Sequence, residues 1–355
     1  MKKNKFREQG IIDLPQAKLF TEEHLQEREY FRSLNEPTWC PGNQAQHMRP
    51  DDTILGLYFN DRAWALPWWI MKNHHIANLI IDGQAVLIAL CEMCSSAAMF
   101  NAVSQGQRYT FRLIGLYNGT HFISDLETGS FWTSFSGESI SGSLKGTVIE
   151  RLPLWQLEWQ QWLNLHPRTQ VLYGQEKLRE GHGSGHSPGS PGIGSTFAET
   201  LVQPLDGRLP HNTLVLGVRC NNSSKAYPLV ELDKFGSIVN DTVAEQEIVI
   251  FHQPKSSLAI AFSPQLKTEI LNFEVTNKGT IIDKNTGSFW NYTGEAYEGK
   301  LKGSQLNYVF SGVEEWYVWC AYNPNTEIFN NVGGLLFKLS HTIPEMGKKF
   351  KKRFL

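Results

Sequence analysis

The chain has 355 residues, of which 41% are hydrophobic and 19% charged, and its formal net charge is −2. This length predicts about two domains, and the apolar content is sufficient for hydrophobic cores. A nearly neutral chain lacks the basic excess with which proteins follow nucleic-acid phosphates, so nucleic acid is not an expected partner.

Two further features of the chain bear on its compartment. No apolar run approaches the roughly 20 residues of a membrane span. The basic start M-K-K-N-K-F-R-E is followed by no apolar segment of the kind that secretory signals contain. We therefore expect a soluble, cytoplasmic protein, in which the five cysteines stay mostly reduced. A close cysteine pair then indicates chemistry rather than a structural disulfide.

The predicted elements are mostly strands. After an N-terminal extension over 1–50, W-A-L-P-W-W-I-M-K-N-H-H-I predicts a helix. V-L-I-A-L, and E-I-V-I-F further along the chain, are typical of buried strands. The segments T-F-R-L-I-G-L-Y, N-G-T-H-F-I-S-D and T-G-S-F-W predict a meander with Asn-Gly and Thr-Gly turns. W-Q-L-E-W-Q-Q-W-L predicts a helix, and so does Y-P-L-V-E-L-D-K-F further along the chain.

Several segments occur twice in the same order. D-L-E-T-G-S-F-W at Asp125 returns as D-K-N-T-G-S-F-W at Asp283, and G-S-L-K-G at Gly142 returns as G-K-L-K-G at Gly299. A period this long indicates a duplicated domain. We predict an α+β, predominantly β fold made of two tandem homologous domains. The predicted ranges are 51–175 for the first repeat, 176–205 for a linker loop, 206–332 for the second repeat and 333–355 for a basic tail.

The repeated turn itself has a structural interpretation. Asp125 can accept backbone N–H bonds across the turn, Gly129 can adopt a positive φ, and Trp132 can anchor the next strand in the core.

Candidate functional residues lie where the two repeats differ. Cys91 and Cys94 follow a predicted buried strand, whereas alignment of the repeats places Gln253 and Ser256 at these positions. The first repeat also has His74 and His75 near the end of its predicted helix, where the second has Phe235 and Gly236. A C-x-x-C pair can form a disulfide, supply a nucleophilic thiolate or chelate a soft ion. The alternative is two cysteines packed as small apolar residues.

The linker R-E-G-H-G-S-G-H-S-P-G-S-P-G-I-G-S contains His182 and His186. These histidines could supply nitrogen ligands or proton transfer if the linker lay over the cysteine pair, as we expect. A solvated linker with incidental histidines is the alternative. Cys40, Cys220 and Cys320 have no such neighbours and are expected to be packing residues. Nucleotide-binding, zinc-protease and serine-hydrolase motifs are absent from the sequence.

Together these motifs resemble the bacterial family named domain of unknown function 3179, over about Asp52 to Phe329. The family pattern has A-Y-P-L, a helix ending in His, I-V-N-D, Y-C-P-L-C-G-S-A, D-x-x-T-G-S-x-W and W-x-x-W-x-x-x-H-P. The matching segments here are Ala65 to Trp68, His74, Ile76 to Asn78, Leu90 to Ser95, Asp125 to Trp132 and Trp159 to Pro167.

The resemblance implies no settled activity. Selenocysteine in the C-x-x-C motif of some relatives implies redox chemistry, although C-E-M-C-S departs here from the usual C-P-L-C-G. Three functional hypotheses remain open. The first is a thiol oxidoreductase that uses Cys91 and Cys94 with His74 or His75, acting on a small-molecule or thiol substrate. The second is a zinc or copper site at Cys91 and Cys94 with His74, His182 or His186. The third is a non-catalytic binding module. The oligomeric state stays open.

Overall fold

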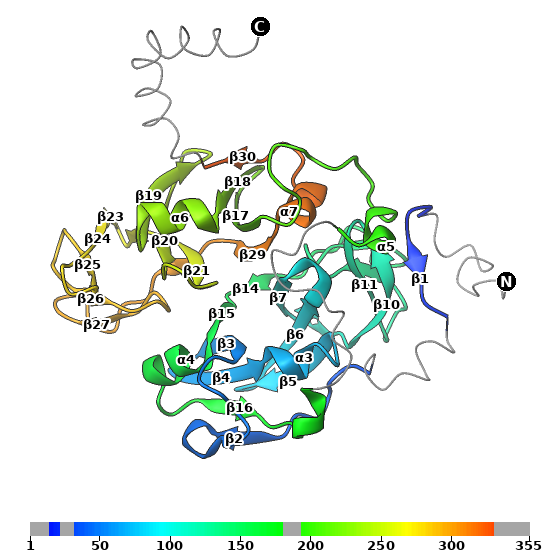
Figure 1. The fold of residues 1–355 in the computed structure, drawn as a ribbon, viewed down its shortest axis with the longest axis horizontal. Coiled ribbons are helices and arrows are strands. Elements are labelled where there is room, and N and C mark those ends of the chain that lie inside the picture. The colour runs from blue at the N-terminus through cyan, green and yellow to red at the C-terminus, as the bar shows by residue number, and fades with distance from the viewer. Residues whose placement is uncertain (1–13, 22–31, 180–192, 330–355) are drawn as a thin grey trace, which may run out of the picture.

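The computed structural model describes residues 14–21, 32–179 and 193–329. These residues form mostly antiparallel β-sheets with a few short helices (Figure 1), which confirms the predicted α+β, predominantly β class. None of the helices within these ranges is long and apolar enough to cross a membrane.

The first half of the chain contains three main sheets. The first sheet has the order β15-β3-β4-β16-β2, with bounds Trp155–Glu158, Thr53–Phe59, Arg62–Pro67, Gln170–Leu172 and Trp39–Pro41. The second has the order β14-β7-β6-β5, with bounds Arg151–Leu152, Ser96–Asn101, Gln84–Cys91 and Ile76–Ile81. The third has the order β1-β10-β11-β12-β13, with bounds Lys18–Leu19, Phe111–Tyr117, Thr120–Asp125, Phe131–Thr133 and Ser139–Ser141.

The second half contains a corresponding set of sheets. One has the order β29-β17-β18-β30, with bounds Ser311–Glu315, Leu214–Cys220, Ser223–Pro228 and Glu327–Ile328. Another has the order β19-β20-β21-β28, with bounds Ile238–Val243, Gln246–His252, Ala259–Ser263 and Asn307–Tyr308. The third has the order β24-β25-β26-β27, with bounds Phe273–Val275, Ile281–Asp283, Phe289–Trp290 and Ala296–Glu298. The parallel pair β4–β16 has its counterpart in the parallel pair β18–β30.

Two predicted helices are shorter than expected. W-A-L-P-W-W-I-M-K-N-H-H-I begins inside β4, and only α3, Trp68–Met71, is an α-helix, because the segment up to Pro67 pairs with β3. Trp155–Glu158 likewise pairs with β3 as β15, so the helix α4 covers only Trp159–Leu165. In the second half α6 spans Leu229–Phe235 and α7 spans Trp316–Tyr322. In both segments pairing with the neighbouring strand β3 prevailed over helix formation.

The repeated turn has the same hydrogen bonds in both halves. Asp125 accepts the Trp132 indole N–H at 2.8 Å and the Thr128 backbone N–H. Asp283 accepts the equivalent bonds from Trp290 at 3.0 Å and from Thr286 at 2.6 Å. Each turn therefore fastens one tryptophan into its core, as the sequence predicted.

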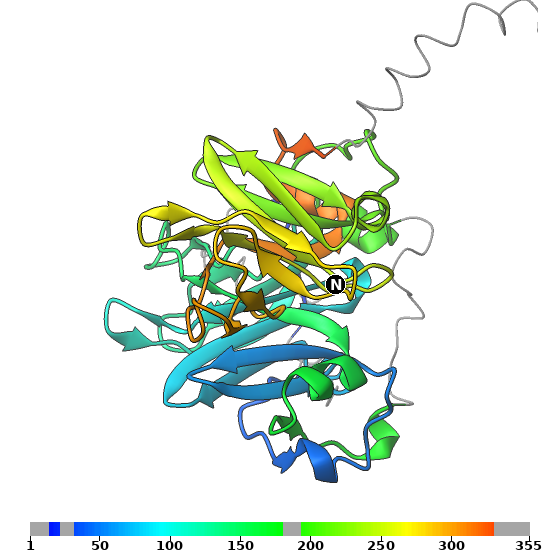
Figure 2. The ribbon, with the colours of Figure 1, turned by 90° about the vertical axis from the view of Figure 1, so that its left-hand side faces the viewer.

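The two halves pack closely against each other. Figure 2 shows the second half, in yellow and orange, stacked on the blue and cyan strands of the first. One hydrophobic core contains Trp155 and Trp162 from the first half together with Phe251 and Trp290 from the second. The Trp155 indole also donates to the Tyr292 carbonyl at 3.0 Å. The halves thus share apolar core rather than a solvated interface.

We expect Trp132→Ala to lower the free energy of unfolding by about 3–5 kcal/mol, because the ring is fully buried and leaves a cavity. Chemical denaturation monitored by circular dichroism measures this. Leu126→Ala in the same turn is the matched control, since Leu126 is 56% exposed and should change stability little. Equal effects of the two substitutions would contradict the anchoring role.

Candidate thiol site

The end of strand β6 brings Cys91 and Cys94 together. The apolar strand ends at Cys91, and Glu92–Cys94 forms one turn of 3-10 helix. Ser95 then adopts a left-handed conformation with φ of 50°, which turns the chain back into β7. The Cys94 thiol donates to the Cys91 backbone carbonyl at 3.9 Å, and both cysteines are reduced. Their exposed fractions are 2% and 0%, so the pair is enclosed by protein.

Hydroxyl groups surround the sulfur of Cys94. It lies 3.0 Å from Ser96 Oγ and 3.5 Å from Thr120 Oγ1, both within hydrogen-bond distance of a sulfur. Burial disfavours the Cys94 thiolate, but hydrogen bonds from Cys91, Ser96 and Thr120 outweigh it and lower the pKa of this thiol. Burial and the neighbouring Cys94 charge raise the pKa of Cys91 well above its usual value. The two thiols are therefore chemically different.

Two imidazoles lie next to the pair. The rings of His75 and His121 are 4.7 Å apart, edge to face, and both interact with the Leu90 carbonyl, one residue before Cys91. Burial lowers the pKa of His75 to about 4 and that of His121 well below its usual range. Both rings are thus uncharged at neutral pH. The ring of His74 contacts the Arg32 carbonyl instead, at 2.9 Å.

The second half of the chain contributes residues from the start of α7. Glu315 precedes this helix and accepts a hydrogen bond from Ser95 Oγ at 3.4 Å. Tyr317 belongs to the same hydrophobic cluster as both cysteines, and burial together with the nearby thiols raises the Tyr317 pKa well above its usual value. The Tyr317 hydroxyl therefore stays neutral beside the pair. The site is complete only when both halves are present.

The described part of the predicted linker covers the pair from another side. The short helix α5, Ser195–Ala198, carries Phe197, which belongs to the same hydrophobic cluster as both cysteines. A Cβ atom built on Gly194 would lie 3.4 Å from the Met93 side chain, so this segment passes directly over the 3-10 turn. His182 and His186 lie outside the described residues.

Metal ligands do not converge in the described part of the chain. Within residues 14–21, 32–179 and 193–329, no group of three or more His, Cys, Asp and Glu side chains is arranged to hold a metal ion.

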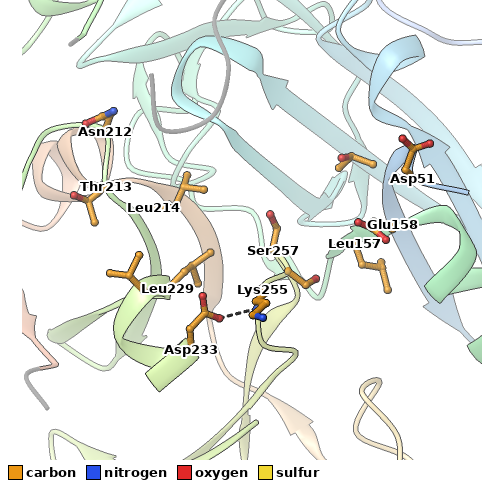
Figure 3. Close-up of a pocket in the computed structure, with 13 residues that line it drawn as sticks. Asp51, Leu157, Glu158, Asn212, Thr213, Leu214, Leu229, Asp233, Lys255 and Ser257 are labelled. Carbon is orange, nitrogen blue, oxygen red and sulfur yellow. Dashed lines mark hydrogen bonds between the residues drawn. The ribbon is translucent and has the colours of Figure 1, made fainter. Parts of the chain in front are cut away.

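In the second half the equivalent position lies beside an open pocket of about 550 Å³. Figure 3 shows Asp233 and Lys255 there, joined by a hydrogen bond of 2.8 Å from the Lys255 backbone N–H. Ser256, which aligns with Cys94, lines this pocket, and Glu158 of the first half faces it. The geometry mirrors the thiol site, in which Glu315 of the second half faces Ser95.

Sequence reasoning missed three residues of the thiol site, Thr120, His121 and Tyr317, and it also missed Phe197, which only covers the site. Thr120 and His121 lie in N-G-T-H, which reads as a plain hairpin, and no spacing rule links them to a cysteine 26 residues away. The W-x-x-W landmark that contains Tyr317 repeats in both halves, and a repeated landmark indicates structure rather than function.

Comparison with known proteins assigns the chain to a family without assigning an activity. Residues 28–326 match the family model described as "Protein of unknown function (DUF3179)", so the chain belongs to this family. No curated protein and no solved structure matches it.

A buried carboxyl lies close to the thiol site, on the opposite side of β29. Glu314 has an exposed fraction of 0%, and neither of its oxygens has a hydrogen-bond partner among the described residues. The nearest guanidinium nitrogen, on Arg151, is 3.9 Å away. Burial raises the pKa of Glu314 to about 8, although Arg151 and Arg219 oppose this shift. The carboxyl is therefore mostly protonated at neutral pH.

This pKa predicts how stability depends on pH. In the folded protein the Glu314 carboxyl holds its proton up to about pH 8. The preference of the folded state for this proton therefore stabilises the protein fully in acid. This stabilisation is lost as the pH rises from the unfolded-state pKa of about 4.3 to the folded-state pKa of Glu314. The wild type should lose up to about 1.4 kcal/mol per pH unit relative to Glu314→Gln in this window.

Urea unfolding of both proteins at several pH values measures the difference. The exposed Glu269, substituted as Glu269→Gln, is the matched control and should follow the wild-type curve. If the free energy of unfolding changes with pH in the same way for the wild type and for Glu314→Gln, the pKa of Glu314 is not raised in the folded protein.

Proposed function

We propose that the protein is a thiol-dependent redox protein in which Cys94 is the nucleophile and Cys91 the resolving thiol. The observation that carries this is the hydrogen bonding of Cys94, whose sulfur lies beside two hydroxyls and the second thiol. These bonds favour the thiolate, the reactive form of cysteine. Cys91 keeps its proton until Cys94 has reacted and then closes the disulfide, a loss of two electrons and two protons from the pair.

Nearby side chains support this division of roles. The uncharged rings of His75 and His121 leave Cys94 without a cationic partner, so hydroxyl donors rather than an imidazolium stabilise its thiolate. A neutral imidazole can still accept the proton that Cys91 gives up.

We further infer that the second half is a duplicate that lost the thiols. The matching sheet orders and the matching Asp–Trp turns support this. In this interpretation residues 51–175 and 206–332 are the two repeats, and the second repeat has become the cover of the first repeat's site.

Two alternatives remain for the same protein. A zinc or copper site would need a ligand beyond Cys91 and Cys94, such as His182 or His186 from the linker. A binding role would use the pocket beside Ser256, whose volume of about 550 Å³ is within the range of small-molecule sites.

The test is oxidation of the reduced protein with a small diffusible oxidant. We expect an intact-mass loss of two hydrogens and a peptide map with one Cys91–Cys94 disulfide. Cys94→Ser should abolish the first oxidation step. Cys91→Ser should instead stop at a sulfenic acid on Cys94, because no resolving thiol remains. Cys220→Ser is the matched control, since Cys220 is also buried but lies outside this cluster, and it should leave the disulfide unchanged.

Elemental analysis of the same sample separates the alternatives. A stoichiometric zinc or copper content that Cys94→Ser removes would favour the metal site. A metal-free protein whose pair stays reduced under every small oxidant would contradict the redox proposal and favour the binding role.

A further inference from the structure

Residues in the described part of the chain enclose the thiol site. Cys94 has an exposed fraction of 0% and Cys91 of 2%. Apolar side chains from three regions surround the pair, namely Phe135 from the first half, Phe197 from α5, and Trp316 and Tyr317 from α7. A substrate must therefore pass through packed side chains to reach the sulfur.

The α5 segment is held in place by hydrogen bonds to the tip of the β10–β11 hairpin. The Asn118 backbone N–H donates to the Thr200 carbonyl at 2.9 Å, and the Gly119 N–H donates to Thr200 Oγ1 at 3.1 Å. Asn118 Oδ1 accepts the Val202 N–H at 3.1 Å. The cover is thus fastened directly beside Thr120, the hydroxyl that hydrogen-bonds Cys94.

The same hairpin tip also fastens α7. The Asn118 side-chain amide donates to the Ala321 carbonyl at 2.8 Å. A Cβ atom added to Gly119 would lie 3.0 Å from Leu201 and 3.2 Å from the Tyr317 ring. Gly119 also has a φ of 81°, so glycine is required there on two grounds. The hairpin tip, α5 and α7 form one continuous cover over the thiols.

Among the residues that the structure describes, no such cover lies over the equivalent position of the second half. There the turn that contains Ser256 opens on the pocket of about 550 Å³, and the residues that line it include no aromatic side chain. Enclosure is therefore a feature of the half that has the thiols, and not of the fold in general.

We propose that the cysteine pair reacts with hydrogen peroxide and that α5, through Phe197, excludes larger oxidants such as glutathione disulfide and bulky alkyl hydroperoxides. This inference rests on the proposed redox function and adds the class of oxidant. Hydrogen peroxide is close to water in size and polarity, so it can cross a packed cover by small side-chain motions. A disulfide substrate must instead place one sulfur in line with Cys94, which requires the cover to open.

Oxidation of the two thiols by hydrogen peroxide needs no further reactant. The Cys94 thiolate attacks one peroxide oxygen, and the O–O bond breaks. The departing hydroxide becomes water with the proton that Cys94 released on ionising. The Cys91 sulfur then attacks the Cys94 sulfenic acid, the S–O bond breaks, and the hydroxyl leaves as water with the Cys91 proton. Two thiols and one hydrogen peroxide thus give one disulfide and two waters.

The experiment compares single-turnover oxidation of the full-length reduced protein by hydrogen peroxide, tert-butyl hydroperoxide and glutathione disulfide. Disulfide formation is followed by rapid alkylation and mass spectrometry. We expect hydrogen peroxide to exceed each larger oxidant by about tenfold or more after correction for its rate with free cysteine. Phe197→Ala should raise the rates with the two larger oxidants and leave the hydrogen peroxide rate nearly unchanged.

Phe273→Ala is the matched control, because Phe273 is also buried, with an exposed fraction of 2% against 8% for Phe197, but belongs to the core shared by the two halves and lies outside the thiol cluster. It should not change the selectivity. If Phe197→Ala does not fold, Phe197→Leu tests the same point with a smaller loss of volume. Circular dichroism checks the folding of each variant.

The results that would contradict the size selection, the role of α5 and the redox function differ from one another. If the pair forms the disulfide with glutathione disulfide as fast as with hydrogen peroxide, the size selection is wrong and the redox function stands. A selectivity that Phe197→Ala leaves unchanged while the variant is folded excludes α5 as the selecting element. If no oxidant, hydrogen peroxide included, forms the disulfide, the proposed function itself fails.

Discussion

The site depends on the cost of ionising a thiol inside a hydrophobic core. A charge removed from water is unstable unless hydrogen bonds replace the lost solvation. Here the Ser96 and Thr120 hydroxyls and the second thiol lie at the Cys94 sulfur, with Tyr317 packed in the same cluster, and replace part of that solvation. No cation is needed, and the neighbouring histidines are neutral. This differs from the common arrangement in which a basic group lowers the pKa of a cysteine.

These residues come from distant parts of the chain, which ties the chemistry to the packing of the two halves. Ser96 is local to the cysteine turn, Thr120 belongs to the next hairpin, and Tyr317 lies on a helix of the second half. Glu315 fixes the same helix start to Ser95. The second half thus contributes to a site although it has no thiol pair of its own. Under the duplication that we propose, the second half was retained for this role after it lost its own thiols.

Local features of the site could be predicted from the sequence, because neighbours along the chain decide them. The strand before Cys91, the cysteine turn and the two Asp–Trp turns each depend on residues within about ten positions. The predicted helices failed where sheet pairing intervened, as at Arg62–Pro67 and Trp155–Glu158. The placement of Tyr317 and Phe197 over Cys94 could not be predicted, since it follows from how the halves pack. Periodicity in one sequence carries no information on that packing.

The direct test of this account is the titration of the two thiols in the folded wild-type protein, by NMR of cysteine labelled with ¹³C at Cβ. The account predicts that Cys94 loses its proton below the ordinary cysteine pKa and Cys91 well above it, with a Cys94 pKa that rises in Thr120→Val. It would be contradicted by two thiols that both titrate above the ordinary value and are insensitive to Thr120→Val.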